Sequence, residues 1–368
     1  MIDRRFFRNI DFWMIFATLA LVGIGILVIG SATHINTPSD DRYWYVQRQG
    51  FFALMNFLLI LVMLKFDYRV LGPLGNMLYG INLLLLIAVM FVGQSALGAQ
   101  RWIQLGPITL QPSEFAKLIM IISLAHLLDA RKERMQSVWD LLPVAAFVVA
   151  PFLLVLKQPD LGTSLVFVAI LLGMVFVAGI DGKLLLKILG AGVACLPAFW
   201  FFLKDYQKSR LTVFMDPNVD PLGAGYHIIQ SKIAIGSGQL FGKGLFNGTQ
   251  SQLNFLPENH TDFIFAVVGE ELGFVGSVVI LLLYMLLLYR GIQTAKNARD
   301  KFGTLLAAGI TSMLAFHLLV NVGMTMGIMP VTGIPLPFMS YGVSALTTNL
   351  VSIGILLNIQ SRRQKLMF

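Results

Sequence analysis

Long runs of apolar residues, separated by short polar stretches, dominate the chain from residue 12 onward. A helix needs about 20 apolar residues to cross a bilayer, and most of these runs are close to that length. They therefore predict membrane-spanning helices rather than the helices of a water-soluble core. Ten spans are predicted, at residues 12–33, 47–64, 74–93, 112–129, 138–156, 161–180, 184–203, 263–289, 304–328 and 340–359.

The composition supports the same fold class. Of 368 residues, 57% are hydrophobic and only 12% are charged, which is roughly half the charged share of a soluble domain. We therefore predict an all-α polytopic membrane protein in which residues 1–368 form one membrane domain. The single cysteine, Cys195, excludes an intrachain disulfide and a cysteine-based metal cluster.

The basic residues predict how the chain is oriented. A net charge of +8 would suggest nucleic acid as the partner of a soluble protein, but here we expect the basic residues to face the cytoplasm and anionic lipid headgroups. Ten spans place both termini on one side. If that side is the cytoplasm, most of the 27 lysines and arginines lie in cytoplasmic segments. We therefore predict a multi-pass protein of the cytoplasmic (inner) membrane with both termini inside and no nucleic-acid partner.

One connection, residues 204–262, is much longer than the others and falls on the predicted outer side. Loops of this length usually carry function. Its segment 226–235 is apolar enough to lie along the membrane surface. The glycines around Lys243 resemble a phosphate-binding loop, but Ser237 and Gly244 stand where that motif needs glycine and Ser or Thr. A nucleotide site is therefore excluded.

Three carboxylates begin predicted helices on the outer side: Glu114, Asp160 and Asp262. Ionisable residues in or beside the membrane are costly and are candidates for function. Since each stands at the outer end of a different helix, the three side chains could converge at one depth. Acidic residues also cap helix N-termini by accepting hydrogen bonds from free N–H groups. Each carboxylate taken alone is therefore better explained as a cap, whereas the three together favour a shared site.

Three basic residues complete this set of candidates. Lys117 lies one helical turn deeper than Glu114 on the same face, where an unpaired ammonium would cost several kcal/mol. A wet functional cavity or a structural pair with Glu114 would both satisfy it. Arg101 and Arg210 stand near aromatic residues on the outer side. They could bind an anionic lipid-linked substrate, or simply lipid headgroups.

Two further features of the predicted spans have structural explanations. Glu270 and Glu271 lie about two turns into the eighth span, where we expect them to take part in packing, and Gly269 and Gly273 have the spacing that lets helices approach closely. The histidines are scattered, without the spacing of metal ligands.

Several polar motifs at the ends of the spans and in the long loop occur together. They include Gln158-Pro159-Asp160-Leu161-Gly162, His260-Thr261-Asp262-Phe263-Ile264-Phe265, Pro335-Leu336-Pro337-Phe338-Met339-Ser340-Tyr341-Gly342, and segments 106–117, 220–227, 230–238, 248–250 and 255–258. Together they resemble the SEDS family (shape, elongation, division and sporulation), most closely its elongation branch, over residues 10–360. One departure is Val343, where the family usually has a glycine. Valine does not easily adopt the positive φ that glycine permits, so the local backbone there is in question.

The resemblance implies a peptidoglycan glycosyltransferase that polymerises lipid II into glycan strands during cell-wall elongation. The reaction would take place on the extracytoplasmic face and release polyprenyl pyrophosphate. The implied partners are lipid II, a class B penicillin-binding protein and other membrane proteins of the elongation complex. Mg²⁺ or Mn²⁺ is the implied cofactor, since acidic oxygens suit both ions, although no motif demands a metal. No organic cofactor is expected.

The resemblance also implies residue roles. Asp262 matches the catalytic aspartate of the family and is the expected general base. Arg101, Lys117 and Arg210 are candidates for binding the phosphates or lining the cavity. Glu114 would hold Lys117 in position, and Asp160 would orient its neighbours or help to bind a divalent ion.

Two other functions fit parts of the sequence. A lipid II flippase would also contain Glu, Lys and Asp within its spans, although it would not explain why the longest polar loop lies on one face. A non-catalytic scaffold for a penicillin-binding protein would use the carboxylates only as caps.

Pyrophosphate is already a good leaving group, so the glycosyltransferase needs one base and cations rather than a second acidic carboxyl.

Overall fold

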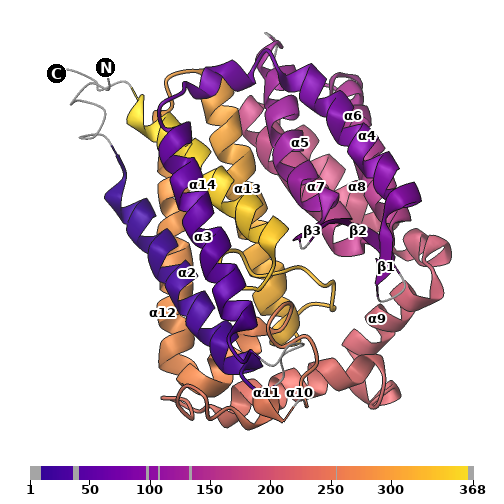
Figure 1. Cartoon of the computed structure of the whole chain (residues 1–368). Coiled ribbons are helices and arrows are strands. Elements are labelled where there is room, and N and C mark those ends of the chain that lie inside the picture. Colours follow the sequence, from indigo (N-terminus) through magenta and orange to yellow (C-terminus); the bar gives the residue numbers. More distant parts are fainter. Residues whose placement is uncertain are drawn as a thin grey trace.

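The computed structural model describes residues 10–35, 41–96, 99–106, 108–131, 135–253 and 255–363. Its main feature is a bundle of long helices, which confirms the all-α prediction (Figure 1). A helix occupies each of the ten predicted spans, with ends that differ by at most four residues except at α12, which runs to Asn297 where the predicted span ends at 289. These helices are α2 (Phe12–Thr33), α3 (Trp44–Met63), α4 (Gly75–Val92), α5 (Pro112–Asp129), α6 (Val138–Lys157), α7 (Leu161–Ala178), α8 (Gly182–Phe199), α12 (Ile264–Asn297), α13 (Lys301–Thr325) and α14 (Val343–Ser361).

Eight helices in the described part of the chain are long and apolar enough to cross a membrane. They support a multi-pass membrane protein. The other two predicted spans are α5 and α8, and α5 carries three charged residues, Glu114, Lys117 and Asp129, within its 18 residues. The count of ten spans therefore stays a prediction.

The first and last described helices have their free ends at the same end of the bundle, as Figure 1 shows for the start of α2 and the end of α14. This arrangement agrees with two termini on one side. The basic residues in 1–9, 132–134 and 364–368, which contribute to the predicted orientation, lie outside the described residues. The cytoplasmic position of the termini stays a prediction.

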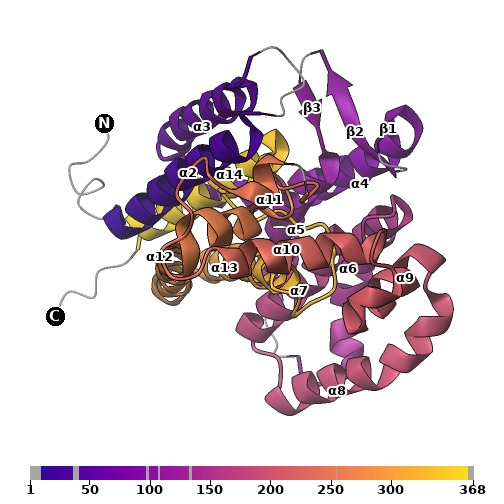
Figure 2. The same cartoon turned by 90° about the horizontal axis from the view of Figure 1, so that it is seen from below.

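The long loop forms short helices at the opposite end of the bundle, and Figure 2 shows α10 crossing beneath the ends of α12 and α13. A small antiparallel sheet of order β1-β2-β3 lies between α4 and α5. The sequence pattern did not predict it, because its strands have only three to seven residues. The smaller elements are η1 (Tyr68–Leu71), β1 (Gln94–Ala96), β2 (Ala99–Leu105), β3 (Ile108–Leu110), η2 (Trp200–Phe202), α9 (Asp205–Met215), η3 (Pro217–Val219), α10 (Ala224–Ser237) and α11 (Thr249–Gln252).

Aspartates begin several of the spanning helices. Asp11 accepts a hydrogen bond from the backbone N–H of Met14 at the start of α2 (3.1 Å), and Asp300 accepts one from Gly303 at the start of α13 (2.7 Å). Such caps satisfy N–H groups that have no partner inside the helix. Within the bundle, α13 is central, since it packs against α5, α7, α12 and α14.

Helix α12 is broken at Gly273, whose backbone has φ 67° and ψ −162°. The break leaves carbonyl groups without hydrogen-bond partners inside the helix. Backbone N–H groups of the long loop bond these carbonyls instead. Lys243 N–H donates to Glu270 O and Gly244 N–H donates to Glu271 O, both at 3.0 Å. The backbone polar groups at the break are thus paired, as a low-dielectric environment requires.

The predicted close approach at Gly269 and Gly273 is confirmed, but the partner is the outer loop rather than another spanning helix. A Cβ at Gly269 would lie 2.9 Å from the Ile235 side chain of α10, and one at Gly273 would lie 2.3 Å from the backbone nitrogen of Gly242. The break itself was not predicted, because it depends on these contacts between segments distant in sequence.

Gly273→Ala is expected to destabilise the protein. Alanine would be held at φ 67° and its Cβ would collide with backbone atoms, and strained backbone of this kind costs about 1–3 kcal/mol. Thermal unfolding in detergent micelles should show a lower Tm for this variant. Gly80→Ala in α4 is the matched control, since its Cβ would meet no atom within 4 Å. Equal Tm values for Gly273→Ala and wild type would contradict the prediction.

The segment between α13 and α14, residues 326–342, has no regular secondary structure. Its prolines, Pro330, Pro335 and Pro337, explain why neither helix continues through it. Val343 is the first residue of α14 and has no positive φ. The departure from the usual glycine therefore introduces no backbone strain.

Candidate functional site

Asp262 lies in the turn that joins the long loop, residues 204–262, to α12, and as a whole residue it is partly exposed. It does not cap the helix, because the N-cap residue is Phe263. Its backbone carbonyl accepts a hydrogen bond from Asn321 Nδ2 at 2.8 Å. Among the described residues, no donor bonds its carboxylate, which is therefore available to a ligand. The cap interpretation does not apply to Asp262.

The surroundings of Asp262 suit a general base. Burial raises the pKa of the Asp262 carboxyl to about 7, and the negative charges of Glu258 and Asp160 contribute in the same direction. Arg210 and Arg101 lower this pKa and so stabilise the ionised form. A base is most effective when its pKa lies near the working pH. The mixture of charges around Asp262 therefore keeps it ready to accept a proton near neutral pH.

Asp160 caps α7 and also faces Arg101. Its Oδ1 accepts the backbone N–H of Thr163 and its Oδ2 accepts the Thr163 hydroxyl, both at 3.0 Å. Arg101 Nη1 lies 3.6 Å from Asp160 Oδ2. The cap interpretation thus describes Asp160 correctly, while the same carboxylate also pairs with Arg101.

Arg101 is held by the turn between α6 and α7. Its Nε donates to Gln158 O at 2.9 Å and its Nη2 donates to Pro159 O. Arg210 approaches from α9 in the outer loop, with its guanidinium 5.9 Å from the ring centre of Tyr206. Two cations from segments about 110 residues apart in sequence therefore act on the same carboxylate.

Glu114 and Lys117 form a buried pair. Lys117 Nζ lies 2.7 Å from Glu114 Oε1 and 3.0 Å from His317 Nε2 of α13. Lys117 is 2% exposed, Glu114 4% and His317 2%. Because an ammonium can only donate, His317 Nε2 must accept and the ring proton must sit on Nδ1.

The predicted site residues thus fall into two groups. Asp160, Arg101 and Arg210 act on Asp262 at the end of the bundle where the long loop lies. Glu114 and Lys117 form the buried pair, and Glu114 is not among the charges that perturb Asp262. Their proposed roles toward substrate stay predictions.

The buried glutamates of α12 anchor the outer loop, as their expected packing role implies. Glu270 Oε1 accepts Lys243 Nζ at 2.8 Å and the backbone N–H of Gln250 at 2.9 Å. Glu271 Oε1 accepts the hydroxyl of Ser31 in α2 at 2.6 Å.

Sequence reasoning missed three polar residues that contact the site groups: His317, Asn321 and Ser340. Ser340 Oγ donates to Thr261 O at 2.6 Å, next to Asp262. A signal was present, because His317 and Asn321 are polar residues inside the apolar run of the ninth predicted span. Such residues face the interior of a bundle and bind a partner there.

The predicted divalent cofactor, Mg²⁺ or Mn²⁺, stays a prediction. Among the described side chains, no group of three or more His, Cys, Asp or Glu residues could hold a metal. The Asp160 oxygens are already bonded by Thr163.

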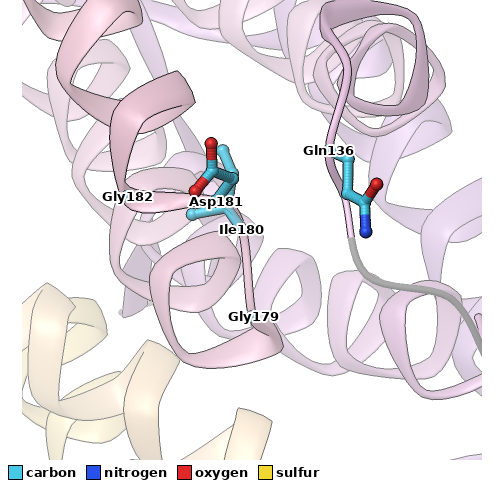
Figure 3. A pocket seen from close by; sticks show the side chains of 5 residues that line it. All are labelled: Gln136, Gly179, Ile180, Asp181 and Gly182. Atoms are coloured by element: carbon cyan, nitrogen blue, oxygen red, sulfur yellow. The ribbon is translucent and has the colours of Figure 1, made fainter.

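Two of the surface hollows differ in their distance from Asp262. The larger, about 590 Å³, is lined by Gln136 and residues 179–182 (Figure 3). It lies at the far end of α7 from Asp160, and this helix of 18 residues is about 27 Å long. A smaller hollow of about 210 Å³ lies between the end of α2 and the turn that contains Glu258 and His260. The smaller one borders the Asp262 turn, whereas the larger one belongs to the opposite end of the bundle.

The whole chain is similar in sequence and in structure to known proteins. The chain is 42% identical to the peptidoglycan glycosyltransferase MrdB of Escherichia coli (strain K12), over 97% of this chain and 95% of MrdB. It resembles a chain of a peptidoglycan synthase complex that coordinates polymerization and crosslinking, with 36% identity, a TM-score of 0.81, and coverage of 95% of this chain and 97% of that chain.

A third comparison is with the rod shape determining protein RodA of Thermus thermophilus, at 32% identity and a TM-score of 0.72, over 97% of this chain and 98% of RodA. Residues 12–365 match the family of FtsW, RodA and SpoVE, described as cell cycle proteins. The chain therefore belongs to the FtsW/RodA/SpoVE family of cell cycle proteins.

Proposed function

We propose that this protein is a peptidoglycan glycosyltransferase that polymerises lipid II into glycan strands, with Asp262 as its general base. The observation that carries this proposal is the Asp262 carboxylate itself: it belongs to a partly exposed residue, no described residue donates a hydrogen bond to it, and burial raises its pKa to about 7 while Arg210 and Arg101 lower it. Membership of the family and 42% identity to a peptidoglycan glycosyltransferase support the reaction class.

In the proposed reaction, the 4-hydroxyl of the acceptor sugar attacks the anomeric carbon of the donor sugar. The hydroxyl proton passes to the Asp262 carboxylate as the new carbon–oxygen bond forms. The bond from the anomeric carbon to the phosphate breaks on the opposite face, so the configuration inverts and polyprenyl pyrophosphate leaves. Since Asp262 is partly accessible, the proton can then pass to solvent and restore the base.

Arg101 and Arg210 are the proposed partners of the pyrophosphate. Guanidinium groups bind phosphate oxygens by paired hydrogen bonds, and stabilising the charge that develops on the leaving group lowers the barrier. Both arginines already lie within electrostatic reach of Asp262. A bound Mg²⁺ or Mn²⁺ would supply further positive charge to the pyrophosphate.

The proposed partner is a class B penicillin-binding protein, which would crosslink the strands that this protein makes. Support comes from the similar chain in a peptidoglycan synthase complex that coordinates polymerization and crosslinking. We further propose that other membrane proteins of the elongation complex join them, and that Asp262 faces the extracytoplasmic side of the cytoplasmic membrane.

The pH dependence of polymerisation tests this assignment. Asp262 must be ionised to accept a proton, so the rate should fall below its pKa of about 7, by about tenfold for each pH unit. The full-length protein would be mixed with its penicillin-binding partner and fluorescent lipid II, and the glycan products separated on a gel between pH 5 and 8. A rate that does not change over this range would contradict Asp262 as the base.

The same preparation distinguishes the other two functions. Movement of lipid II across sealed vesicles without polymer would support a flippase. Neither polymer nor movement, with intact lipid II and partner, would support a scaffold.

A further inference from the structure

The turn that carries Asp262 is held at three consecutive carbonyl groups. Tyr341 N–H donates to His260 O at 2.9 Å, Ser340 Oγ donates to Thr261 O at 2.6 Å, and Asn321 Nδ2 donates to Asp262 O at 2.8 Å. All three donors come from the end of α13 and the segment between α13 and α14. The position of the Asp262 backbone is therefore set by a part of the chain about 60 to 80 residues further on.

Asn321 links the two sides of this contact. The same Nδ2 also donates to Ile334 O at 2.8 Å, so one amide group bridges the Asp262 turn and the segment that follows α13. Asn321 is fully buried. Its orientation is fixed by chemistry, because both neighbours are carbonyl oxygens and only the NH₂ side of the amide can donate to them.

Ser340 supports the same segment from within. Its hydroxyl accepts the backbone N–H of Leu336 at 2.8 Å while it donates to Thr261 O. Gly333 lies beside the Asp262 carboxylate, because a Cβ at that position would be 3.2 Å from Asp262 Oδ2. The segment between the helices therefore contacts the Asp262 turn at its backbone and approaches the carboxylate at Gly333.

We propose that Asn321, assisted by Ser340, is a positioning residue that holds the Asp262 carboxylate where it accepts the proton of the acceptor hydroxyl. This inference rests on the proposed function of Asp262 as base. A carboxylate displaced by about 1 Å can lose on the order of 10²-fold in rate. We call the three hydrogen bonds to the carbonyls of His260, Thr261 and Asp262 the backbone clamp. This clamp accounts for how a turn between a loop and a helix can support a reaction that needs fixed geometry.

The clamp also determines which charges Asp262 meets. Glu258, Asp160, Arg210 and Arg101 all act on it, and burial is the largest cause of its raised pKa. If the turn moves outward without the clamp, Asp262 becomes more hydrated and its pKa falls. A loss of positioning should therefore move the pH profile as well as the rate.

The chain offers a matched control for Asn321. Asn358 in α14 is also buried, and its Nδ2 also donates to two carbonyls, Met63 O and Phe66 O, both at 2.7 Å. It does so at the end of the bundle opposite Asp262. Ser123 is the control for Ser340, since its buried hydroxyl donates to Gly75 O of α4 at 2.9 Å.

The test measures lipid II polymerisation by full-length Asn321→Ala, Ser340→Ala, Asn358→Ala and Ser123→Ala, each with the penicillin-binding partner, from pH 5 to 8. We expect kcat to fall on the order of 10²-fold for Asn321→Ala and less for Ser340→Ala. In both, the acid limb should move to lower pH with KM for lipid II unchanged. Both controls should keep the wild-type pH profile. If Asn321→Ala does not fold, Ser340→Ala carries the test.

Wild-type kcat and pH profile in both variants, or equal changes in the controls, would overturn the inference. Asp262→Asn, measured beside them, distinguishes a failure of the base assignment from a failure of the positioning role. If Asp262→Asn still polymerises lipid II, the base assignment fails. If it is inactive while Ser340→Ala and Asn321→Ala behave as wild type, only the positioning role fails.

Discussion

Replacing Asp262 by asparagine is expected to lower the rate of glycan polymerisation by about 10²–10⁴-fold, the usual contribution of a positioned base. Asparagine has nearly the same shape but cannot accept a proton at neutral pH. The substitution removes no side-chain hydrogen bond among the described residues, and the backbone contact with Asn321 is retained. The loss should therefore appear in kcat rather than in the amount of folded protein.

The stability of Asp262→Asn provides an independent check. The folded state raises the pKa of Asp262 from 3.8 to about 7, so it binds the proton more tightly than the unfolded chain does. The ionised carboxylate thus destabilises the fold as pH rises from about 4 to 7. At pH 8 the variant should have a Tm at least equal to that of wild type.

Asp205→Asn is the matched control, since Asp205 is an exposed aspartate in the first turn of α9 within the same outer loop. It should polymerise lipid II at the wild-type rate. Activity of Asp262→Asn, or loss of activity in Asp205→Asn, would contradict the assignment of Asp262 as the specific base.

Lys117→Met is expected to give the largest loss of stability. The Glu114 carboxylate is 4% exposed, and the substitution removes the Lys117 ammonium that lies 2.7 Å from it. Breaking a buried ion pair by removing one partner costs about 3–5 kcal/mol. Thermal unfolding in detergent should show a Tm well below that of wild type, and a Tm within error of wild type would contradict a tightly coupled pair.

The double variant Glu114→Gln, Lys117→Met separates the structural and functional roles of this pair. Removing both charges together leaves no unpaired ion, so most of the stability should return. Polymerisation by this variant then decides between the two interpretations that the sequence left open. Recovered activity would assign a structural pair, whereas a stable but inactive protein would assign Lys117 or Glu114 a role toward substrate.

The spanning helices could be predicted because each is encoded locally. A run of apolar residues of sufficient length specifies a helix in the membrane whatever its neighbours are, and the predicted bounds of α2 and α5 agree with the structure. The motifs were equally informative about function. The family is confirmed, and the predicted glycosyltransferase activity is confirmed at the level of the activity named for its relatives.

Features that depend on distant contacts could not be predicted in this way. The break at Gly273 is caused by residues 239–244 of the loop, and a lone glycine in an apolar run carries no sign of it. The partner of Lys117 on α13 is 200 residues away in sequence. Asn321 was recognisable as a polar residue in a span, but its two carbonyl partners are defined only once the chain is folded.

The burial of α14 has a consequence for its stability in the membrane. Of the eight helices able to cross the membrane, α14 has the lowest mean hydropathy and the largest buried share. Its polar side chains, such as Asn349, Ser352 and Asn358, face protein rather than lipid. The helices that enclose α14, among them α3, α5 and α13, precede it in the chain, so its buried polar groups depend on contacts with segments far away in sequence. We therefore expect α14 to be stable in the membrane only against the surrounding helices, and not as an isolated span.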